Sequence, residues 1–297
     1  MSRANDKRAR LRAGMASDKA VVAIGAHDAL TARMASTYAF DAVWVSGLAV
    51  ATMTYAIPDV NLTTMTETLD QAVRFDRATD LPVIADCDNG FGGLNNVVRT
   101  LVEFEAAGIA GISIEDNLFP KRNSLLGSDT KRELIPVEEQ ARRFRAAKRA
   151  QDSDDFTLIA RVESLIAGHG VEDACARADA YVDAGVDAIL IHSRDKTLSE
   201  IEGFLGSWKG LGSVPLVCVP TLFPSFTSAE LHAKGFDLVI LANQVMRAAV
   251  GAMETTLERL AVAGRAADVD GDIVPVDHIF DLVDTKGAIA LEDEGLV

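Results

Sequence analysis

The sequence predicts an α/β fold, namely a (β/α)8 TIM barrel that spans residues 1–297 as a single domain. Eight short runs of β-forming residues alternate with helical patterns along the chain. Each run is an almost continuous apolar stretch, which is typical of strands that are covered on both faces. No Pro-, Gly- or Ser-rich linker divides the chain, so a closed barrel is favoured over a doubly wound open sheet, which shares the same alternation.

The predicted elements follow one another in a regular order. The basic segment from Arg3 to Arg12 predicts a short amphipathic helix before the first strand. The strands are expected at 21–27, 42–47, 82–88, 111–116, 157–164, 188–193, 215–221 and 238–244. Several helical patterns end in a glycine where a helix C′ residue belongs, directly before the next strand: Gly108, Gly185 and Gly235.

Two more helices are expected after the last strand. Residues 243–264 form a long amphipathic pattern, and a shorter pattern lies around 276–283. Helices beyond a closed barrel commonly make contacts between subunits, so residues 244–297 are predicted to serve oligomerisation.

The composition limits the classes of partner. Hydrophobic residues make up 48% of the chain and charged residues 25%, which is the usual balance of a soluble globular protein. The formal net charge of -15 argues against nucleic acid or an anionic membrane surface as a partner. An anionic substrate would need a metal ion, or a few well-placed basic residues, to reverse the field inside its site.

The cysteines and the apolar segments indicate a cellular compartment. Cys87, Cys175 and Cys218 stand far apart without a C-x-x-C spacing, so they suggest neither a disulfide framework nor a structural zinc site. No run of about 18 apolar residues is present to span a membrane, and no signal-type segment follows the basic start. We therefore expect a cytoplasmic protein.

Polar residues gather where the predicted strands end, which is where barrels of this kind carry their active sites. They include Ser46, Gly47, Asp86, Asp88, Glu115, Asp116, Arg161, Glu163, His192, Ser193, Thr221 and Asn243. Asp86 and Asp88 are two residues apart, so on a strand their side chains share one face while Cys87 points the other way. With Glu115 on the neighbouring strand they form an oxygen-rich group suited to Mg²⁺. Alternatively, this D-x-D sequence ends a strand and caps the next helix.

Basic residues stand at the ends of two other predicted strands. Arg161 lies inside an apolar strand, and a buried Arg needs an anionic partner. That partner is either Glu163, or another acid of the barrel, or the phosphate of a substrate held as a fork. His192 follows an apolar run directly and is a candidate phosphoryl donor, although a lone His there is more often a satisfied core residue.

Two other segments complete the candidate site. Trp44 precedes a Ser46-Gly47-Leu48 turn, whose backbone N–H groups could hold a carboxylate, although an ordinary strand-to-helix turn would look the same. No phosphate-binding glycine motif is present, so nucleotide cofactors have no support. Residues 112–134 run from a strand that ends in two carboxylates into a long polar loop. Such a loop is either a lid over a binding site or a solvated surface insertion.

These segments resemble the phosphoenolpyruvate mutase branch of the isocitrate lyase superfamily. The resemblance covers essentially the whole chain, through AHDALTARMA, VWVSGLAVA, DCDNGFGG, IARVESLIAG, DAILIHSR and ANQVMRAAV. Its most specific piece is E-D-N-L-F-P-K-R-N-S from Glu115, which is similar to the mutase signature E-D-K-x₅-N-S. The resemblance implies a barrel with a swapped C-terminal helix, assembled as a homotetramer, that is, a dimer of helix-swapped dimers. It implies Mg²⁺, a small anionic substrate, and the interconversion of phosphoenolpyruvate and phosphonopyruvate, the entry to phosphonate natural products.

The resemblance also assigns roles to individual residues. Asp86 matches the direct metal ligand, and Asp59, Asp88 and Glu115 match the residues that hold its waters. The pocket for the pyruvyl part is matched by Trp44, Ser46, Gly47 and Leu48. The phosphoryl pocket is matched by Lys121, Asn123, Ser124, Arg161 and His192, with Leu125 as a further substrate-binding residue and Asp59 counted among the catalytic groups. The loop around 121–131 is expected to close over the site and keep water out.

Departures from the family pattern leave alternatives open. The signature lysine after Glu-Asp is Asn117 here, so the substrate could be a close analogue, such as an arsenic counterpart of phosphoenolpyruvate. Lyases of the superfamily carry a catalytic Cys in a K-[KR]-C-G-H motif, whereas this chain has K-R-N-S-L, which disfavours C–C bond cleavage. Phosphonopyruvate hydrolases differ mainly in loop residues that admit water, and Asn123-Ser124 resembles the mutase version. A mutase is therefore the first expectation, a hydrolase the alternative, and a 2-methylisocitrate-type lyase the least favoured.

Overall fold

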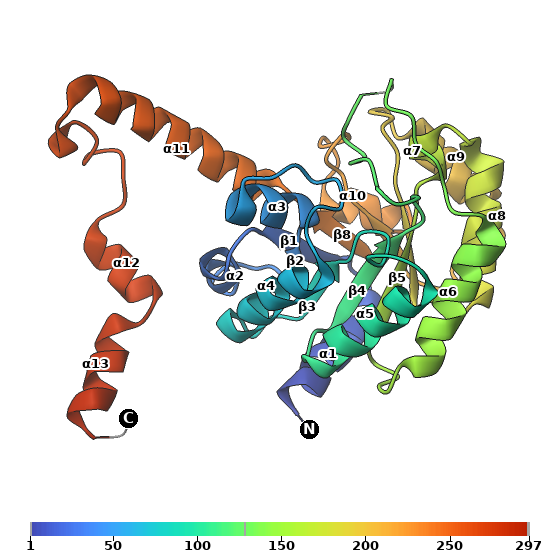
Figure 1. Ribbon diagram of the computed structural model, residues 1–297, viewed down its shortest axis with the longest axis horizontal. Helices are drawn as coiled ribbons and strands as arrows, with labels where there is room; N and C mark the ends of the chain where they lie inside the picture. The colour runs from blue at the N-terminus through green and yellow to red at the C-terminus, as the bar shows by residue number, and fades with distance from the viewer. Residues whose placement is uncertain (1, 128, 296–297) are drawn as a thin grey trace. The chain divides into compact units, whose positions relative to one another are not determined.

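The computed structural model describes residues 2–127 and 129–295 and is shown in Figure 1. The chain divides into one compact unit that ends at Asn243 and a second unit that begins at Gln244. The division falls where the sequence predicts the start of the C-terminal helices. The single-domain organisation over 1–297 stays a prediction.

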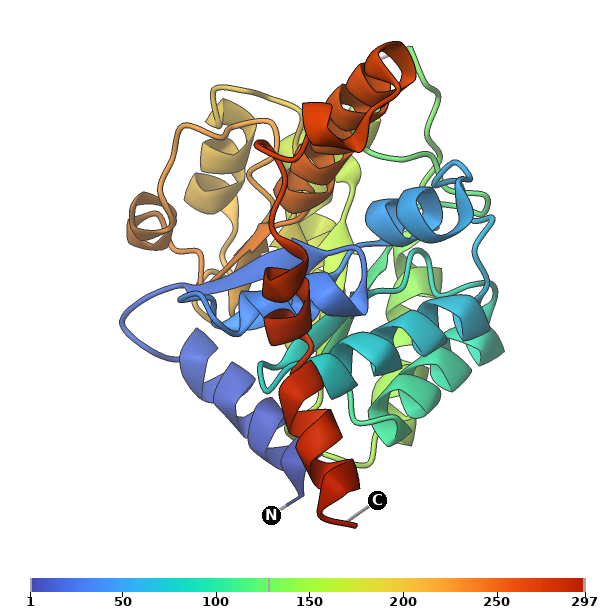
Figure 2. The ribbon, with the colours of Figure 1, turned by 90° about the vertical axis from the view of Figure 1, so that its left-hand side faces the viewer.

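The first unit contains a closed barrel of eight parallel strands in chain order, in which β8 pairs with β1. The predicted fold class is therefore confirmed. Helices lie around the outside of the barrel in both perpendicular views (Figures 1 and 2). The strands are β1 Val21–Ala26, β2 Ala42–Val45, β3 Val83–Asp86, β4 Gly111–Glu115, β5 Thr157–Val162, β6 Ala188–Ile191, β7 Leu216–Cys218 and β8 Leu238–Leu241.

The helices of the barrel alternate with these strands. Their bounds are α2 Ala29–Ala35, α3 Gly47–Tyr55, α4 Met65–Ala78, α5 Leu94–Ala106, α6 Val137–Ala150, α7 Ser164–Ala167, α8 Gly170–Asp183, α9 Ser199–Ser207 and α10 Ser228–Ala233. The predicted glycine joints are confirmed after α5, α8 and α10. Gly108, Gly185 and Gly235 have φ of 91°, 94° and 105°, a left-handed conformation that glycine adopts without steric cost. Each joint turns the chain from a helix into the next strand.

The N-terminal helix α1, Arg3–Met15, is confirmed as a helix, but its expected amphipathic character needs correction. Its buried face carries Lys7 and Arg8 beside Leu11 and Met15. The Lys7 ammonium donates to Oδ1 of Asp76 at 2.6 Å, so the buried charge has an anionic partner. The inner face of α1 is therefore held by ion pairing and hydrogen bonding as well as by apolar packing.

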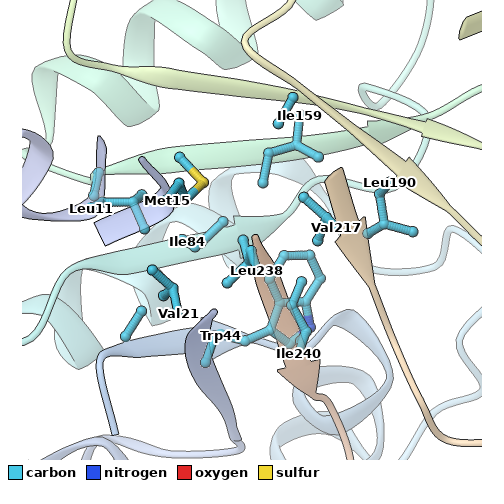
Figure 3. Close-up of a cluster of buried hydrophobic side chains, with 14 of the residues drawn as sticks. Leu11, Met15, Val21, Trp44, Ile84, Ile159, Leu190, Val217, Leu238 and Ile240 are labelled. Carbon is cyan, nitrogen blue, oxygen red and sulfur yellow. The ribbon is translucent and has the colours of Figure 1, made fainter. Parts of the chain in front are cut away.

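Apolar side chains fill the interior of the barrel. Leu11 and Met15 of α1 belong to the same buried cluster as Ile84, Ile159 and Leu238, and Figure 3 shows these side chains together. Arg8 and Arg12 of α1 donate to backbone oxygens of Ile109 and Phe156, which precede β4 and β5. The helix therefore covers the N-terminal ends of the strands.

The second unit consists of helices α11 Gln244–Ala263, α12 Val276–Leu282 and α13 Thr285–Asp293, with a 3-10 turn at Ala266–Asp268. The long predicted helix and the shorter one after it are confirmed, whereas α13 was not predicted. Large apolar side chains are exposed on this unit, among them Leu257 at 67% and Val262 at 85%. Among the described residues, no helix is long and apolar enough to cross a membrane.

Candidate active site

A cavity of about 60 Å³ lies among the residues that follow the C-terminal ends of the strands. The side chains that line it come from the strand ends, from the start of α3, from the loop between α3 and α4 and from the loop between β4 and α6. The lining residues are Trp44, Ser46, Leu48, Asp59, Asp86, Glu115, Lys121, Asn123, Ser124, Leu125, Arg161, His192, Val219, Thr221, Ala242 and Asn243. Every residue to which the family resemblance assigns a role therefore lines this one cavity except Gly47 and Asp88. Of the other polar residues predicted at strand ends, Thr221 and Asn243 also line it, whereas Asp116, Glu163 and Ser193 do not.

Asp86 and Asp88 come together through a turn rather than along a strand, which corrects the sequence prediction. β3 ends at Asp86, and Asp88 has a left-handed φ of 48°. The Asp88 N–H donates to Oδ1 of Asp86 at 3.2 Å, which holds the two carboxylates on one side. The alternative that this sequence caps the next helix is wrong, because the N-cap of α5 is Gly93.

Lys121 places a cation between two of the acids. Its ammonium lies 2.8 Å from Oδ1 of Asp59 and also donates to Oδ1 of Asp88. Burial would lower the pKa of Lys121, but the carboxylates of Asp88 and Asp59 outweigh it and raise this pKa well above its ordinary value. Burial raises the pKa of Asp88 to about 6, against the opposing effect of Lys121. Lys121 is therefore a permanent cation inside the site.

Glu115 ends β4 on the same side of the cavity. Its Oε1 accepts a hydrogen bond of 3.0 Å from Nδ2 of Asn117, and its Oε2 lies 3.6 Å from Nη1 of Arg161. Burial raises the pKa of Glu115 to about 8 despite the nearby charges of Arg161 and Lys121. A divalent cation close to this carboxylate would favour its ionised form.

The acidic side of the cavity fits the expected Mg²⁺. In the described part of the chain, no three His, Cys, Asp or Glu side chains converge closely enough to ligate one ion directly. Mg²⁺ keeps several waters and takes one or two carboxylates, so a single direct ligand with water-bridged neighbours is the arrangement these acids allow. A Cβ added at Gly47 would lie 3.2 Å from Oδ2 of Asp86 and 3.3 Å from Oδ1 of Asp88, so glycine keeps the space beside both oxygens open.

The basic side is organised by Glu163, whose side chain is completely buried. Its Oε1 lies 2.5 Å from Nε of Arg161 and 3.2 Å from Nδ1 of His192. Its Oε2 accepts a hydrogen bond of 3.1 Å from the hydroxyl of Ser124, which in turn accepts one from Arg161. Arg161 thus pairs closely with Glu163 and at a longer distance with Glu115, while its guanidinium still lines the cavity.

His192 is buried and hydrogen bonded, yet it also faces the cavity. Its Nδ1 lies 3.0 Å from Nη2 of Arg161. Burial lowers the pKa of His192, and the Arg161 charge lowers it further, with Glu163 acting in the opposite direction. The imidazole is therefore neutral near pH 7, and the contacts with Arg161 and Glu163 are both made by its Nδ1.

The Ser46-Gly47-Leu48 segment forms the N-terminal end of α3, a helix of nine residues. The Ser46 hydroxyl caps this helix by accepting from the N–H of Ala49 at 3.4 Å. Ser46 and Leu48 line the cavity. The first N–H groups of a helix lack intrahelical partners and attract anions, so this end of α3 suits a carboxylate.

The loop between β4 and α6, residues 117–134 apart from residue 128, which lies outside the described residues, forms one wall of the cavity. Its two ends pair through the hydrogen bond from the N–H of Leu118 to the carbonyl of Glu133 at 2.9 Å. Lys121 and Ser124 of the loop are buried, whereas Phe119 is 63% exposed. The alternative of a purely solvated insertion is therefore wrong for the part of the loop that faces the barrel.

Glu163 was predicted at a strand end and as a possible partner of Arg161, and the structure confirms that pairing. Asn61 is a residue of the site that was not predicted, and the sequence offers no signal for it. Its Oδ1 accepts from the N–H of Lys121 at 2.5 Å, and its Nδ2 donates to Oδ2 of Asp88 at 3.0 Å.

Acids on one side of a small cavity, with Arg161 and a neutral His192 on the other, are suited to a divalent metal and an anionic substrate. Solved structures that match the barrel over its whole length belong to the phosphoenolpyruvate mutase/isocitrate lyase superfamily, and the chain is of this class. Within it, the chain belongs to the phosphoenolpyruvate phosphomutase family, whose sequence model matches residues 11–261. The family resemblance seen in the sequence is thereby confirmed.

Individual relatives include both mutases and a hydrolase. The chain is 40% identical over 283 residues to a phosphonopyruvate hydrolase of Variovorax sp. (strain Pal2), which covers 95% of this chain and 96% of the relative. A crystal structure of a phosphoenolpyruvate phosphomutase from Streptomyces platensis subsp. rosaceus matches with a TM-score of 0.93 and 39% identity, covering 98% of this chain and 99% of the other. A phosphonopyruvate hydrolase in complex with oxalate and Mg²⁺ matches with a TM-score of 0.89 and 38% identity, covering 100% of both chains.

Proposed function

We propose that this protein is a phosphoenolpyruvate mutase-type isomerase that interconverts phosphoenolpyruvate and phosphonopyruvate with Mg²⁺. The observation that carries the proposal is the position of Asn123 and Ser124. These two loop residues line the cavity, where they donate to Asp59 and Glu163, and they are the pair that resembles the mutase signature. Lys121 and Ser124 of the same loop are buried against the barrel, which supports a reaction that excludes water.

In the proposed reaction, the P–O bond of phosphoenolpyruvate breaks and its electron pair stays on oxygen, which gives the enolate of pyruvate. The loose, metaphosphate-like phosphoryl group then bonds to C3 of the enolate, and the enolate oxygen becomes a ketone. No proton, oxidant or second substrate is consumed. The protein must therefore hold two fragments in place and keep water away.

Each side of the cavity supports one of these tasks. The N-terminal end of α3, from Ser46 to Leu48, would hold the carboxylate of the substrate. Arg161 and His192 would hold phosphoryl oxygens, because both line the cavity. With Nδ1 accepting from Nη2 of Arg161 at 3.0 Å, the neutral imidazole would donate from Nε2. Asn123 now donates to Oδ2 of Asp59 at 2.6 Å and would add a contact from the loop.

Asp86 would ligate Mg²⁺ directly, and Asp59, Asp88 and Glu115 would hold its waters. Bound there, the ion would stabilise the negative charge that develops on the enolate oxygen. Lys121 would remain beside the same acids and balance their charge. The Mg²⁺ of the solved phosphonopyruvate hydrolase supports this choice of metal.

Hydrolysis of phosphonopyruvate to pyruvate and phosphate is the second candidate, favoured by the 40% identity to the Variovorax hydrolase. Carbon–carbon lyase activity has less support, because the loop positions 117–127 and 129–134 contain no cysteine. Asn117 stands in place of the signature lysine, so the proposal includes an analogue substrate such as arsenoenolpyruvate.

Phosphorus NMR of the purified protein with phosphonopyruvate and Mg²⁺ distinguishes the candidates. We expect phosphoenolpyruvate to appear, and the Asp86→Ala protein prepared in the same way should form none. Inorganic phosphate and pyruvate as the only products would assign the protein as a hydrolase. Turnover of the arsenic analogue but not of phosphonopyruvate would assign an analogue mutase.

We also propose a homotetramer of helix-swapped dimers, which would serve phosphonate biosynthesis in the cytoplasm. The exposed apolar residues of the second unit support this assembly, because they include Leu257, Val262 and Val276, each at least 66% exposed. Sedimentation equilibrium of the full chain tests it, with a mass of four chains as the expected result and a monomer as the result against it.

A further inference from the structure

The loop between β4 and α6 is held together from inside by one arginine. Arg132 is only 8% exposed, and its guanidinium donates to four backbone carbonyls of the loop. The distances are 2.9 Å to Asn123, 3.0 Å to Leu126, 3.0 Å to Thr130 and 3.5 Å to Gly127. The described part of the loop has no helix, and its strand-like pairing there is the bridge at its two ends. The arginine therefore adds to two turn hydrogen bonds, which run from the N–H of Leu126 to the carbonyl of Asn123 and from the N–H of Thr130 to the carbonyl of Gly127, at 3.1 Å each.

A second arginine reaches the loop from the rim of the barrel. Arg194 follows β6, and its Nη1 donates to the carbonyl of Leu126 at 3.0 Å. Two guanidinium groups thus converge on one carbonyl oxygen. Burial lowers the pKa of Arg132, and the charge of Arg194 lowers it further. Within the described residues neither arginine has a carboxylate at ion-pair distance. The backbone carbonyls that accept their hydrogen bonds therefore stabilise the two neighbouring positive charges.

The carbonyl of Asn123 connects this arrangement to the candidate active site. On the outer side Arg132 holds the Asn123 backbone, and on the inner side the Asn123 side chain donates to Asp59 at 2.6 Å. The next residue, Ser124, donates to Glu163 at 3.1 Å. Asn123 and Ser124 are therefore fixed between Arg132 on one side and the barrel acids on the other.

We propose that Arg132 is a positioning residue that holds Asn123 and Ser124 against the reacting groups. Arg194, at the rim of the barrel, holds the same loop through the carbonyl of Leu126. Arg132 does not line the cavity, so it acts through the loop backbone. The fork of a guanidinium reaches several carbonyls at once, which the ammonium of a lysine does not. The expected change in products rests on the proposed function. The expected change in loop order rests on the loop contacts alone.

The test compares Arg132→Met with Arg132→Lys and with the matched control Arg122→Met. Arg122 is exposed on the same loop, and its side chain makes only 3.3 Å contacts to the carbonyls of Pro120 and Lys121. The first measurement is the rate of chymotrypsin cleavage after Leu125 and Leu126 in the presence of oxalate and Mg²⁺. The second is the ratio of phosphate to phosphoenolpyruvate formed from phosphonopyruvate, followed by phosphorus NMR.

We expect Arg132→Met to be cleaved at least about tenfold faster, because the loop opens locally more often. We expect its product ratio to shift towards phosphate by about tenfold or more and its kcat to fall more than its KM rises, because a displaced Asn123 lets water compete. Arg132→Lys should behave like Arg132→Met, and Arg122→Met like the unaltered protein.

Unchanged cleavage and an unchanged product ratio in Arg132→Met would overturn the proposal. If circular dichroism shows that Arg132→Met does not fold, the same two measurements are made on Arg194→Met. Unaltered cleavage of Arg194→Met would show that Arg194 does not hold the loop. If the unaltered protein converts phosphonopyruvate to neither phosphoenolpyruvate nor phosphate, the proposed function is wrong. The cleavage assay still tests whether Arg132 orders the loop.

Discussion

The ammonium nitrogen of Lys121 lies 2.8 Å from Oδ1 of Asp59, and the two side chains are only 4% and 5% exposed. The contact joins the loop that walls the cavity to the acidic side of the barrel. It also places a fixed positive charge among carboxylates whose repulsion would otherwise oppose burial. The same acids are those proposed to hold Mg²⁺, so the lysine and the metal act on one set of oxygens.

Replacing Lys121 by Met should therefore destabilise the metal-free protein by about 3 kcal/mol, because buried Asp59 and Asp88 lose their cation. Mg²⁺ should recover part of this loss by supplying positive charge to the same acids. Urea unfolding in EDTA and in Mg²⁺ measures both effects. Lys131→Met is the control, because its side chain is 84% exposed and should change stability by less than about 0.5 kcal/mol. Equal stability of the Lys121 and Lys131 variants would contradict the role of the buried pair.

Replacing Asp86 by Ala should abolish Mg²⁺ binding and lower turnover by about a thousandfold or more, because the proposed direct ligand is lost. The fold should persist, since Asp86 accepts only the hydrogen bond from Asp88 among the described contacts. Calorimetric titration with Mg²⁺ checks binding, and circular dichroism checks the fold. Asp70→Asn, on the exposed face of α4, should bind Mg²⁺ as the unaltered protein does. Tight Mg²⁺ binding by Asp86→Ala would remove Asp86 from the metal site.

Replacing Asn117 by Lys restores the family signature beside Glu115. The Asn117 amide now donates to Oε1 of Glu115 at 3.0 Å, so a lysine there would bring a positive charge next to the acidic side. If the departure concerns substrate choice, kcat/KM on phosphonopyruvate should rise about tenfold while that on the arsenic analogue falls. Parallel steady-state assays on both substrates measure the change. A uniform change on both substrates would mean that Asn117 does not select between them.

The free energy of unfolding should depend on pH partly through the protonation of His192. Burial lowers its pKa in the folded protein below the ordinary 6.5, so the unfolded chain takes up a proton at a higher pH than the folded protein does. This contribution to stability is complete above pH 6.5 and is lost as the pH falls below it, by at most about 1.4 kcal/mol per pH unit.

His192→Asn should flatten this part of the stability curve, measured by urea unfolding from pH 7.5 to 5. The exposed His278 provides the matched control, because His278→Asn should leave the slope unchanged. An identical acid slope in the unaltered protein and in His192→Asn would show that another group carries the pH dependence.

The sequence predicted the fold and most of the candidate site because both rest on local patterns. Apolar runs and helix-ending glycines report the environment of each segment, and eight of them in alternation favour a closed barrel. Strand ends then indicated where polar residues such as Asp86, Glu115, Arg161 and His192 would meet, and the structure brings them to one cavity. The roles of these residues in binding and turnover stay predictions.

The sequence misjudged the features that depend on backbone turns and on burial of charge. Asp88 reaches its place through a left-handed turn, which strand alternation does not describe. Lys7 and Arg8 lie inside, because Asp76 and nearby carbonyls compensate their burial. Asn61 gave no signal, since its partners Lys121 and Asp88 are distant along the chain.

By itself, the sequence determined the class of fold, the family and the edge of the barrel at which the polar residues gather. Only the tertiary structure decided which of these residues pair, with Lys121 joining Asp59, Arg161 joining Glu163, and Arg132 holding the carbonyl of Asn123. The physical reason is that periodicity along a chain reflects local burial. Pairing depends instead on barrel closure and on the path of a loop, which bring residues distant in sequence within hydrogen-bonding distance.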